Sequence, residues 1–264
     1  MVALGRAIQK SSRVPVVVSH ETAAAFHGLA LYRPTETHVH TIVPEERPGA
    51  MRGIVRHRGA IREGELVEVH GILCTNLVRT LADICRTSPF EQAVVVADAT
   101  LRRIAHTSPA TYDLEAAAEV RRAARTLAAL SAHGLTRAER VLRFADGRAQ
   151  LPGESISRIR LASIGFSRIV LQREVPGPRG RPYYVDFSLD DVPALGEFDG
   201  SIKYVDGRML DGRTTAEVFD REKQREDWIR GATRLPLVRW GWPHIKTADS
   251  LSGRLSAFGI HPPR

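Results

Sequence analysis

The first part of the chain alternates between apolar and polar residues over several short stretches. Thr37–Val43, Ile54–His57 and Leu66–Cys74 have the two-residue period of half-buried strands, and Pro, Gly and charged residues separate them. Val14–Val18 is a further apolar strand candidate. These stretches predict a sheet in the N-terminal region.

Helical spacing of apolar residues appears between and after these strands. Ser19 is expected to cap a helix over His20–His27, and Thr75 to cap a helix over Asn76–Cys85. Pro89–Ala105 has the apolar stripe of a further helix. Strands and helices together predict an α+β arrangement.

We therefore expect residues 1–108 to form an α+β domain and residues 109–150 to follow it as a helical connector. The connector is rich in Ala, Arg, Leu and Glu and is broken at Gly134 and Gly147. Its arginines are expected to form a solvated helix face rather than a DNA-binding surface. They are Arg121, Arg122 and Arg125.

After Leu151-Pro152-Gly153 the pattern becomes an alternation of helices and strands. The expected helices are Ser155–Ile164, opened by Glu154, and Val218–Arg230. The expected strands are Gln172–Val175, Val185–Leu189, Ala194–Asp199 and Leu235–Trp240. We expect a second domain over residues 151–247 and a C-terminal tail over residues 248–264, which makes the chain α/β overall.

Acidic residues interrupt two of the apolar strands. Glu197 and Asp199 lie two apart and share one strand face, while Phe198 points into the core. A hairpin through Asp190–Pro193 brings Asp186 to the same face. Oxygen ligands of this kind suit a hard cation such as Mg²⁺ or Mn²⁺, and the matching chemistry is phosphodiester hydrolysis.

An alternative without function stays open for the same residues. Asp199-Gly200 is also an ordinary turn dipeptide. A solvated edge hairpin would explain both Asp186 and the nearby Lys203.

The strand and helix motifs of this region resemble the PD-(D/E)xK nucleases, and more closely the domains related to very-short-patch repair endonucleases. The matching segments are Val185–Phe187, Glu197–Gly200, Lys203, Glu222–Ile229 and Leu237–Trp242. The resemblance covers roughly residues 151–247. It implies a restriction-endonuclease-like mixed sheet flanked by helices, and a Mg²⁺- or Mn²⁺-dependent DNA endonuclease.

The resemblance also implies roles for individual residues. The catalytic set would be Asp186, Glu197, Asp199 and Lys203, and the metal ligands Asp186, Glu197 and Glu154. Gln172 and Arg225 would contact the phosphate or the DNA. One departure is that Asp199 occupies the position of the usual lysine, so that Lys203 would be a migrated substitute.

The N-terminal region resembles antitoxins of the abortive-infection type IV toxin–antitoxin family. The matching segments are Ser19–Leu29, Gly71–Asp83 and Ala97–Arg102. That family usually begins with a DNA-reading winged helix, but only 18 residues precede Ser19. Either the protein lacks this head, or its true start lies upstream.

Composition narrows the function only a little. The net charge of +8 and a pI near 10.1 favour a nucleic-acid partner. Cys74 and Cys85 are most simply reduced core residues of a cytoplasmic protein. No apolar run is long enough for a membrane span.

Four histidines lie on the predicted strands of the N-terminal region: His38, His40, His57 and His70. Three of them would be enough ligands for a zinc ion. The alternative is that they are exposed strand residues without a metal.

Three functions remain in competition. The leading hypothesis is a metal-dependent DNA endonuclease. The second is a non-catalytic, antitoxin-like transcriptional regulator that keeps the nuclease fold as a scaffold. The third is a protein-interaction module that neutralises a cognate toxin.

Overall fold

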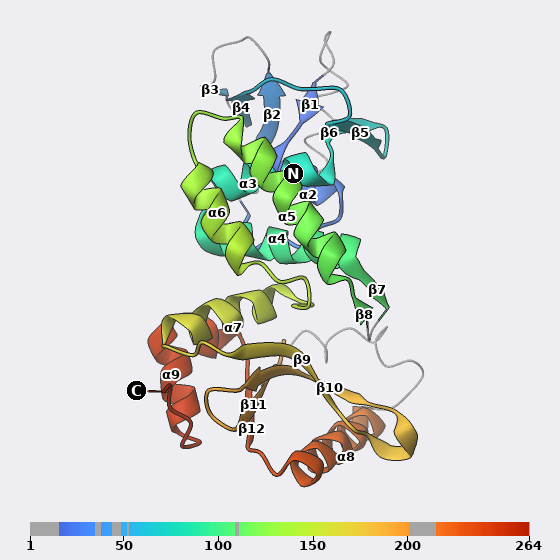
Figure 1. The fold of residues 1–264 in the computed structure, drawn as a ribbon, viewed down its shortest axis with the longest axis vertical. Coiled ribbons are helices and arrows are strands. Elements are labelled where there is room, and N and C mark those ends of the chain that lie inside the picture. The colour runs from blue at the N-terminus through green and yellow to red at the C-terminus, as the bar shows by residue number, and fades with distance from the viewer. Residues whose placement is uncertain are drawn as a thin grey trace. The chain divides into compact units, whose positions relative to one another are not determined.

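The computed structural model describes residues 16–34, 38–43, 49–51, 53–108, 111–200 and 215–263. The chain forms two compact units, Met1–Pro152 and Gly153–Arg264 (Figure 1). Within the described ranges there are eight α-helices and two mixed sheets, which confirms the predicted α/β class.

Six strands of the N-terminal unit form one mixed sheet in the order β3-β4-β2-β1-β6-β5. They are β1 (Val17–Val18), β2 (Val39–Val43), β3 (Gly49–Met51), β4 (Ile54–Arg58), β5 (Leu66–Val69) and β6 (Ile72–Thr75). β1 pairs with β6 and β2 with β4 in parallel, and the other neighbours are antiparallel. Strands are found at the predicted stretches Thr37–Val43 and Ile54–His57, as β2 and β4. The predicted stretch Leu66–Cys74 is instead divided into β5 and β6 by a turn at His70 and Gly71, which both have positive φ.

Five helices accompany this sheet. They are α2 (His20–Phe26), α3 (Leu77–Thr87), α4 (Phe90–Ala105), α5 (Leu114–Ala129) and α6 (Leu135–Phe144), and β7 (His106–Ser108) pairs with β8 (Thr111–Tyr112) in a small hairpin. The cap of α3 differs from the prediction. Asn76 accepts a hydrogen bond from the Arg79 amide at 2.8 Å, whereas the Thr75 hydroxyl contacts that of Thr80.

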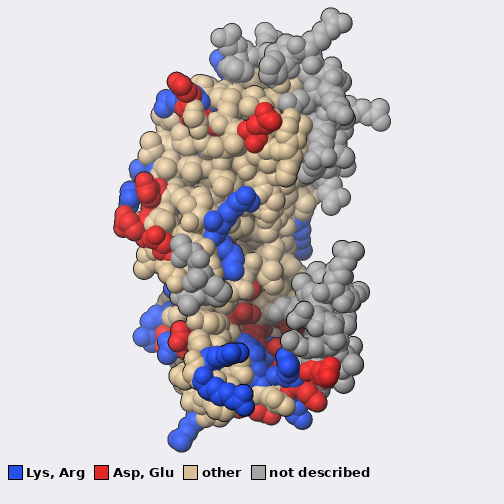
Figure 2. Space-filling model, turned by 90° about the vertical axis from the view of Figure 1, so that its right-hand side faces the viewer, with Lys and Arg blue, Asp and Glu red and all other residues tan. Residues whose placement is uncertain are grey.

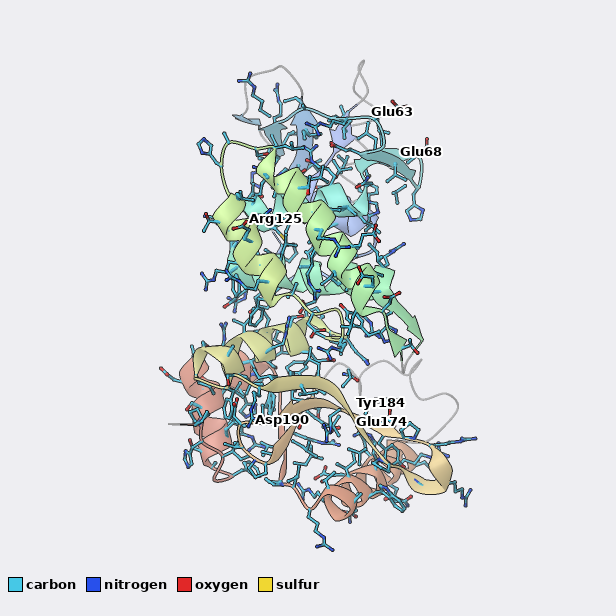
Figure 3. All side chains as sticks on the ribbon, viewed as in Figure 1. Glu63, Glu68, Arg125, Glu174, Tyr184 and Asp190 are labelled. Atoms are coloured by element: carbon cyan, nitrogen blue, oxygen red, sulfur yellow. The ribbon has the colours of Figure 1, made fainter. Side chains whose placement is uncertain are left out.

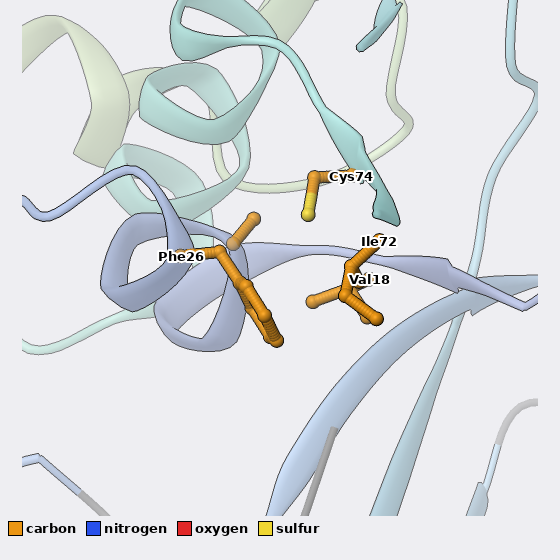
Figure 4. Packing of buried hydrophobic residues seen from close by; sticks show 5 residues of the cluster. Val18, Phe26, Ile72 and Cys74 are labelled. Atoms are coloured by element: carbon orange, nitrogen blue, oxygen red, sulfur yellow. The ribbon is translucent and has the colours of Figure 1, made fainter. Parts of the chain in front are cut away.

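One cluster of the core of this unit lies between α2 and the sheet. Figure 4 shows Val18, Phe26, Ile72 and Cys74 packed together, each of them buried. Cys74 and Cys85 are free thiols, as predicted for reduced core residues. Burial raises the pKa of Cys74 to about 12, so this thiol stays protonated and packs as a small apolar side chain.

The segment expected to be a connector is part of the N-terminal unit. α5 and α6 pack against α3, α4 and each other. Ala117, Ala124 and Ala128 of α5 are fully buried because a small side chain allows close helix approach. Arg122 and Arg125 of α5 are exposed, as expected, and Arg125, labelled in Figure 3, pairs with Glu139 at 2.6 Å while its side chain stays 60% exposed. Arg121 does not belong to this solvated face, because it is half-buried and donates from Nη2 to the Ala145 carbonyl at 2.8 Å.

The C-terminal unit is built on a four-stranded sheet in the order β12-β11-β10-β9. Its elements are α7 (Pro152–Ser163), β9 (Ile169–Val175), the 3₁₀ turn η1 (Pro178–Gly180), β10 (Tyr183–Leu189), β11 (Ala194–Phe198), α8 (Thr215–Thr233), β12 (Leu237–Trp240), the 3₁₀ turn η4 (Trp242–Ile245) and α9 (Ala248–Ser256). β11 and β12 are parallel, and the other pairs are antiparallel. Figure 1 shows α7 and α8 on opposite faces of the sheet.

Close approach of α7 to the sheet depends on two glycines. A Cβ on Gly153 would lie 2.0 Å from the Phe198 ring, and one on Gly196 would lie 2.2 Å from the Trp240 ring. Trp240 also donates from Nε1 to Ser157 Oγ at 2.8 Å. These contacts fix the first turn of α7, and with it Glu154, against β11 and β12.

The segment expected to be a C-terminal tail is also ordered structure. α9 packs against β12 and η4, with Leu251 and Leu255 buried. Arg254 of this helix donates to the Arg239 carbonyl at 3.0 Å. Residues 248–263 therefore complete the C-terminal unit.

Candidate functional site

Asp186 and Glu197 lie on the two strands of the β10–β11 hairpin. The antiparallel register pairs Phe187 with Gly196, so Asp186 and Glu197 occupy the next opposing positions. This confirms the predicted hairpin and the adjacency of the two acidic residues.

The side chain of Asp186 is hydrogen-bonded on both oxygens. Oδ2 accepts from the Phe198 amide at 2.9 Å, and Oδ1 accepts from Gln172 Nε2 at 3.3 Å. The same Gln172 nitrogen lies 3.4 Å from Glu154 Oε2. One amide group thus links the carboxylates of Asp186 and Glu154.

Gln172 and Glu154 reach this position through local backbone features. Gln172 has a φ of +52°, an unusual conformation for a residue in the middle of a strand. Glu154 lies in the first turn of α7 with only 3% of its surface exposed. The positive end of the helix dipole favours a carboxylate there.

Glu197 contacts two arginines instead of the other acidic residues. Its Oε1 lies 2.6 Å from Arg225 Nη1, and its Oε2 lies 3.1 Å from Arg239 Nη2. Because Glu197 is 8% exposed, this pairing compensates a carboxylate that would otherwise be buried alone.

Arg239 joins a wider ionic network. It also contacts Glu222 at 3.4 Å and Glu226 at 3.3 Å on α8. Burial works against the charged guanidinium, but the carboxylates of Glu197, Glu222 and Glu226 outweigh it and raise the pKa of Arg239. Arg239 is not among the site residues predicted from the sequence. The pattern that could have indicated it is an arginine between Val238 and Trp240, two buried residues of a core strand.

Arg225, which the resemblance assigns to the phosphate or the DNA, pairs with Glu197 in this structure. It also donates from Nη2 to the Tyr184 carbonyl at 2.6 Å, and its guanidinium lies 5.7 Å from the Tyr183 ring centre. Asp199 is half-buried, and its amide donates to the Trp240 carbonyl at 2.8 Å. Lys203 lies outside the described residues.

The predicted site residues therefore form two groups. Glu154, Gln172 and Asp186 are linked to each other, and Glu197 is linked to Arg225 and Arg239. In the described ranges, no group of three or more His, Cys, Asp and Glu side chains is arranged to hold a metal ion.

Three histidines of the N-terminal unit, His20 of α2, His40 of β2 and His57 of β4, form a stack. His40 Nδ1 and His57 Nε2 are 2.9 Å apart, and the ring of His20 stacks on His57 with centroids 3.5 Å apart. His70 is exposed and does not take part. Burial, and then the neighbouring His40 and Arg86, lowers the pKa of His57 to about 4. His40 and His57, which the strand pattern predicted, thus contact His20, which the strand pattern did not include.

No family model and no solved structure matches this chain. Two uncharacterized proteins of Mycobacterium tuberculosis, from strains CDC 1551 / Oshkosh and H37Rv, are each 30% identical to it over 179 residues. The match covers 67% of this chain and 60% of each relative, less than two thirds of their length.

Among the described helices, none has both the length and the apolar character needed to cross a bilayer.

Proposed function

We propose that the C-terminal unit is an endonuclease-like domain that hydrolyses phosphodiester bonds of DNA with Mg²⁺ or Mn²⁺. The main support is the opposition of Asp186 and Glu197 on neighbouring strands of a mixed sheet. Glu154, linked to Asp186 through Gln172, adds a third carboxylate from α7. The PD-(D/E)xK resemblance assigns the same three residues to the metal.

The donor chemistry fits a hard cation, because carboxylate oxygens are the ligands that Mg²⁺ and Mn²⁺ prefer. Asp186, Glu154 and Glu197 would hold it. Both oxygens of Glu197 contact arginines, so Glu197 becomes a ligand only when Arg225 or Arg239 moves away. A bound cation would supply an activated water and shield the developing negative charge.

The remaining residues act on the phosphate and the water. In this proposal Arg225 neutralises a phosphate oxygen once it leaves Glu197, and Gln172 orients the Asp186 carboxylate. Asp199 assists near the water, and Lys203 stabilises the charge of the transition state.

A second function is favoured by the ion pairs of Glu197. Because two arginines compensate this carboxylate, the sheet would be stable as a scaffold without any cation. The protein would then be a cytoplasmic, antitoxin-like regulator or a toxin-neutralising protein, with DNA or a cognate toxin as its partner. The resemblance of residues 14–105 to antitoxins supports this alternative.

Plasmid cleavage by the purified chain tests the proposal. We expect nicking or cutting with Mg²⁺ or Mn²⁺, and none with EDTA. Glu197→Gln and Asp186→Asn should each lower the rate at least about 100-fold, because a ligand charge is lost. Glu174→Gln is the matched control. Glu174 is an exposed carboxylate on β9, beside Tyr184 in the register with β10 (Figure 3).

Two results would decide against cleavage at this site. Activity that survives Glu197→Gln would point to a different site. If the wild-type protein cleaves neither duplex, single-stranded, mismatched nor branched DNA, the scaffold function is preferred.

A further inference from the structure

A groove of about 950 Å³ lies beside the candidate site, between the η1 turn and α8. Its lining is strongly basic, with four arginines and one carboxylate. The lining residues are Pro178, Arg179, Arg181, Tyr183, Arg221, Glu222, Gln224 and Arg225. Figure 2 shows Lys and Arg atoms gathered on the surface of the C-terminal unit, with carboxylates beside them.

Backbone geometry holds two of these arginines on the groove wall. Arg179 and Gly180 both have positive φ, +57° and +74°, which makes η1 a tight turn. A Cβ on Gly177 would lie 1.9 Å from the Arg181 carbonyl oxygen, so the chain folds back closely on itself here. The turn therefore presents Arg179 and Arg181 from a fixed backbone.

Three of the arginines are exposed. Within the described part of the chain, no carboxylate forms an ion pair with Arg179, Arg181 or Arg221. Like charges this close together repel one another unless an anion binds between them. Guanidinium groups match the planar, bidentate geometry of phosphate oxygens.

Arg225 connects this groove to the candidate site. It lines the groove and pairs with Glu197 at 2.6 Å. An anion in the groove would compete with Glu197 for the same guanidinium.

We propose that this groove binds the phosphate backbone of a nucleic-acid strand, and that Arg225 exchanges Glu197 for a phosphate when the strand binds. An open groove with arginine walls suits a chain of phosphates better than a small ligand, whose pockets are mainly apolar. The exchange of Arg225 rests on the proposed function, since it frees Glu197 for the cation. Binding in the groove does not rest on it.

Fluorescence anisotropy of a labelled 20-nucleotide DNA, in EDTA and over a series of NaCl concentrations, tests the groove in the full-length chain. The triple variant Arg179→Gln, Arg181→Gln and Arg221→Gln should weaken binding at least about tenfold at 0.1 M salt. It should also lower the slope of log K against log salt by about 2 to 3, since three phosphate contacts are lost.

The control variant Arg122→Gln, Arg125→Gln and Arg234→Gln removes the same charge at exposed positions outside the groove. Its affinity should stay within about twofold of the wild type, since the lost charges contact no phosphate. Equal weakening by the two triple variants overturns the groove assignment. The assignment is also overturned if the protein binds anionic phospholipid vesicles through the groove arginines but does not bind DNA.

A double-mutant cycle tests the exchange of Arg225. Glu197→Gln should tighten DNA binding in EDTA about threefold or more, because it releases Arg225. The gain should vanish when Arg225→Gln is added, and Glu174→Gln should give no comparable gain. A gain that persists without Arg225 overturns the exchange.

The two proposals fail separately. If DNA binding depends on the groove arginines but no cleavage is found, the proposed nuclease activity is contradicted. If cleavage requires Glu197 but does not depend on the groove arginines, the proposed role of the groove is contradicted.

Discussion

Glu197 on β11 and Arg239 on β12 stand opposite each other in the parallel register, and their side chains pair at 3.1 Å. The pair joins the centre of the sheet to α8, because Glu222 and Glu226 contact the same guanidinium. An arginine at this position thus compensates three carboxylates. Its removal would leave them to repel one another.

We expect Arg239→Gln to lower the free energy of unfolding of the C-terminal unit by about 1–2 kcal/mol. The expected loss of stability is modest because the Arg239 side chain is 25% exposed, so that water screens part of its charge. Tryptophan fluorescence during urea unfolding measures it, since Trp228, Trp240 and Trp242 all lie in this unit. Arg234→Gln, at an exposed position of the same unit, should leave the transition unchanged.

Two glycine substitutions should have opposite effects. Gly196→Ala forces a Cβ into the Trp240 ring, so we expect it to destabilise the unit by about 1–3 kcal/mol. Gly231→Ala, in α8 with nothing within 4 Å of the new Cβ, should be neutral or stabilise by up to about 1 kcal/mol. The same fluorescence assay compares them. Equal effects would mean that the ring moves aside at little cost.

Local pattern predicted the elements well, and tertiary partners account for what it missed. The β10–β11 hairpin follows from two-residue alternation on both sides of a turn-forming Asp190–Pro193. Thr75 and Asn76 are both competent caps, and only backbone geometry selects Asn76. The ion pairs of Glu197 depend on Arg225 and Arg239, which come from elements much later in the chain.

The burial of α5 could have been read from its alanines. Ala117, Ala124 and Ala128 form one apolar stripe, which is typical of a helix that packs closely rather than one that bridges domains. This stripe packs on α3. The partner of such a stripe depends on contacts between distant parts of the chain, which a local sequence pattern does not predict.

Limited proteolysis tests the extent of the N-terminal unit. Because α5 and α6 pack on α3 and α4, we expect trypsin to leave an N-terminal fragment that retains both helices through Phe144. Mass spectrometry of the stable fragments reads this out. A stable fragment that ends near Ala105 would mean that the two helices are the separate connector that the sequence suggests.

The histidine stack should make the N-terminal unit sensitive to acid. Burial, and then the charges of its neighbours, lowers the pKa of His57 from 6.5 to about 4 and also lowers those of His20 and His40. Between those two values the unfolded chain binds more protons than the native one. The free energy of unfolding therefore falls as the pH drops from about 6.5 towards 4.

Scanning calorimetry of the whole chain between pH 7 and pH 5 measures this effect, with tryptophan fluorescence identifying the transition of the C-terminal unit. We expect the Tm of the other transition to fall over this range, and His57→Gln to reduce the fall because glutamine does not titrate. The comparison separates the contribution of His57 from that of Asp83. Burial raises the pKa of Asp83, although Arg79 and Arg86 act in the opposite direction. His70→Gln, at an exposed position, should keep the wild-type response. An equal fall in wild type and His57→Gln would show that His57 is not the group that makes the unit sensitive to acid.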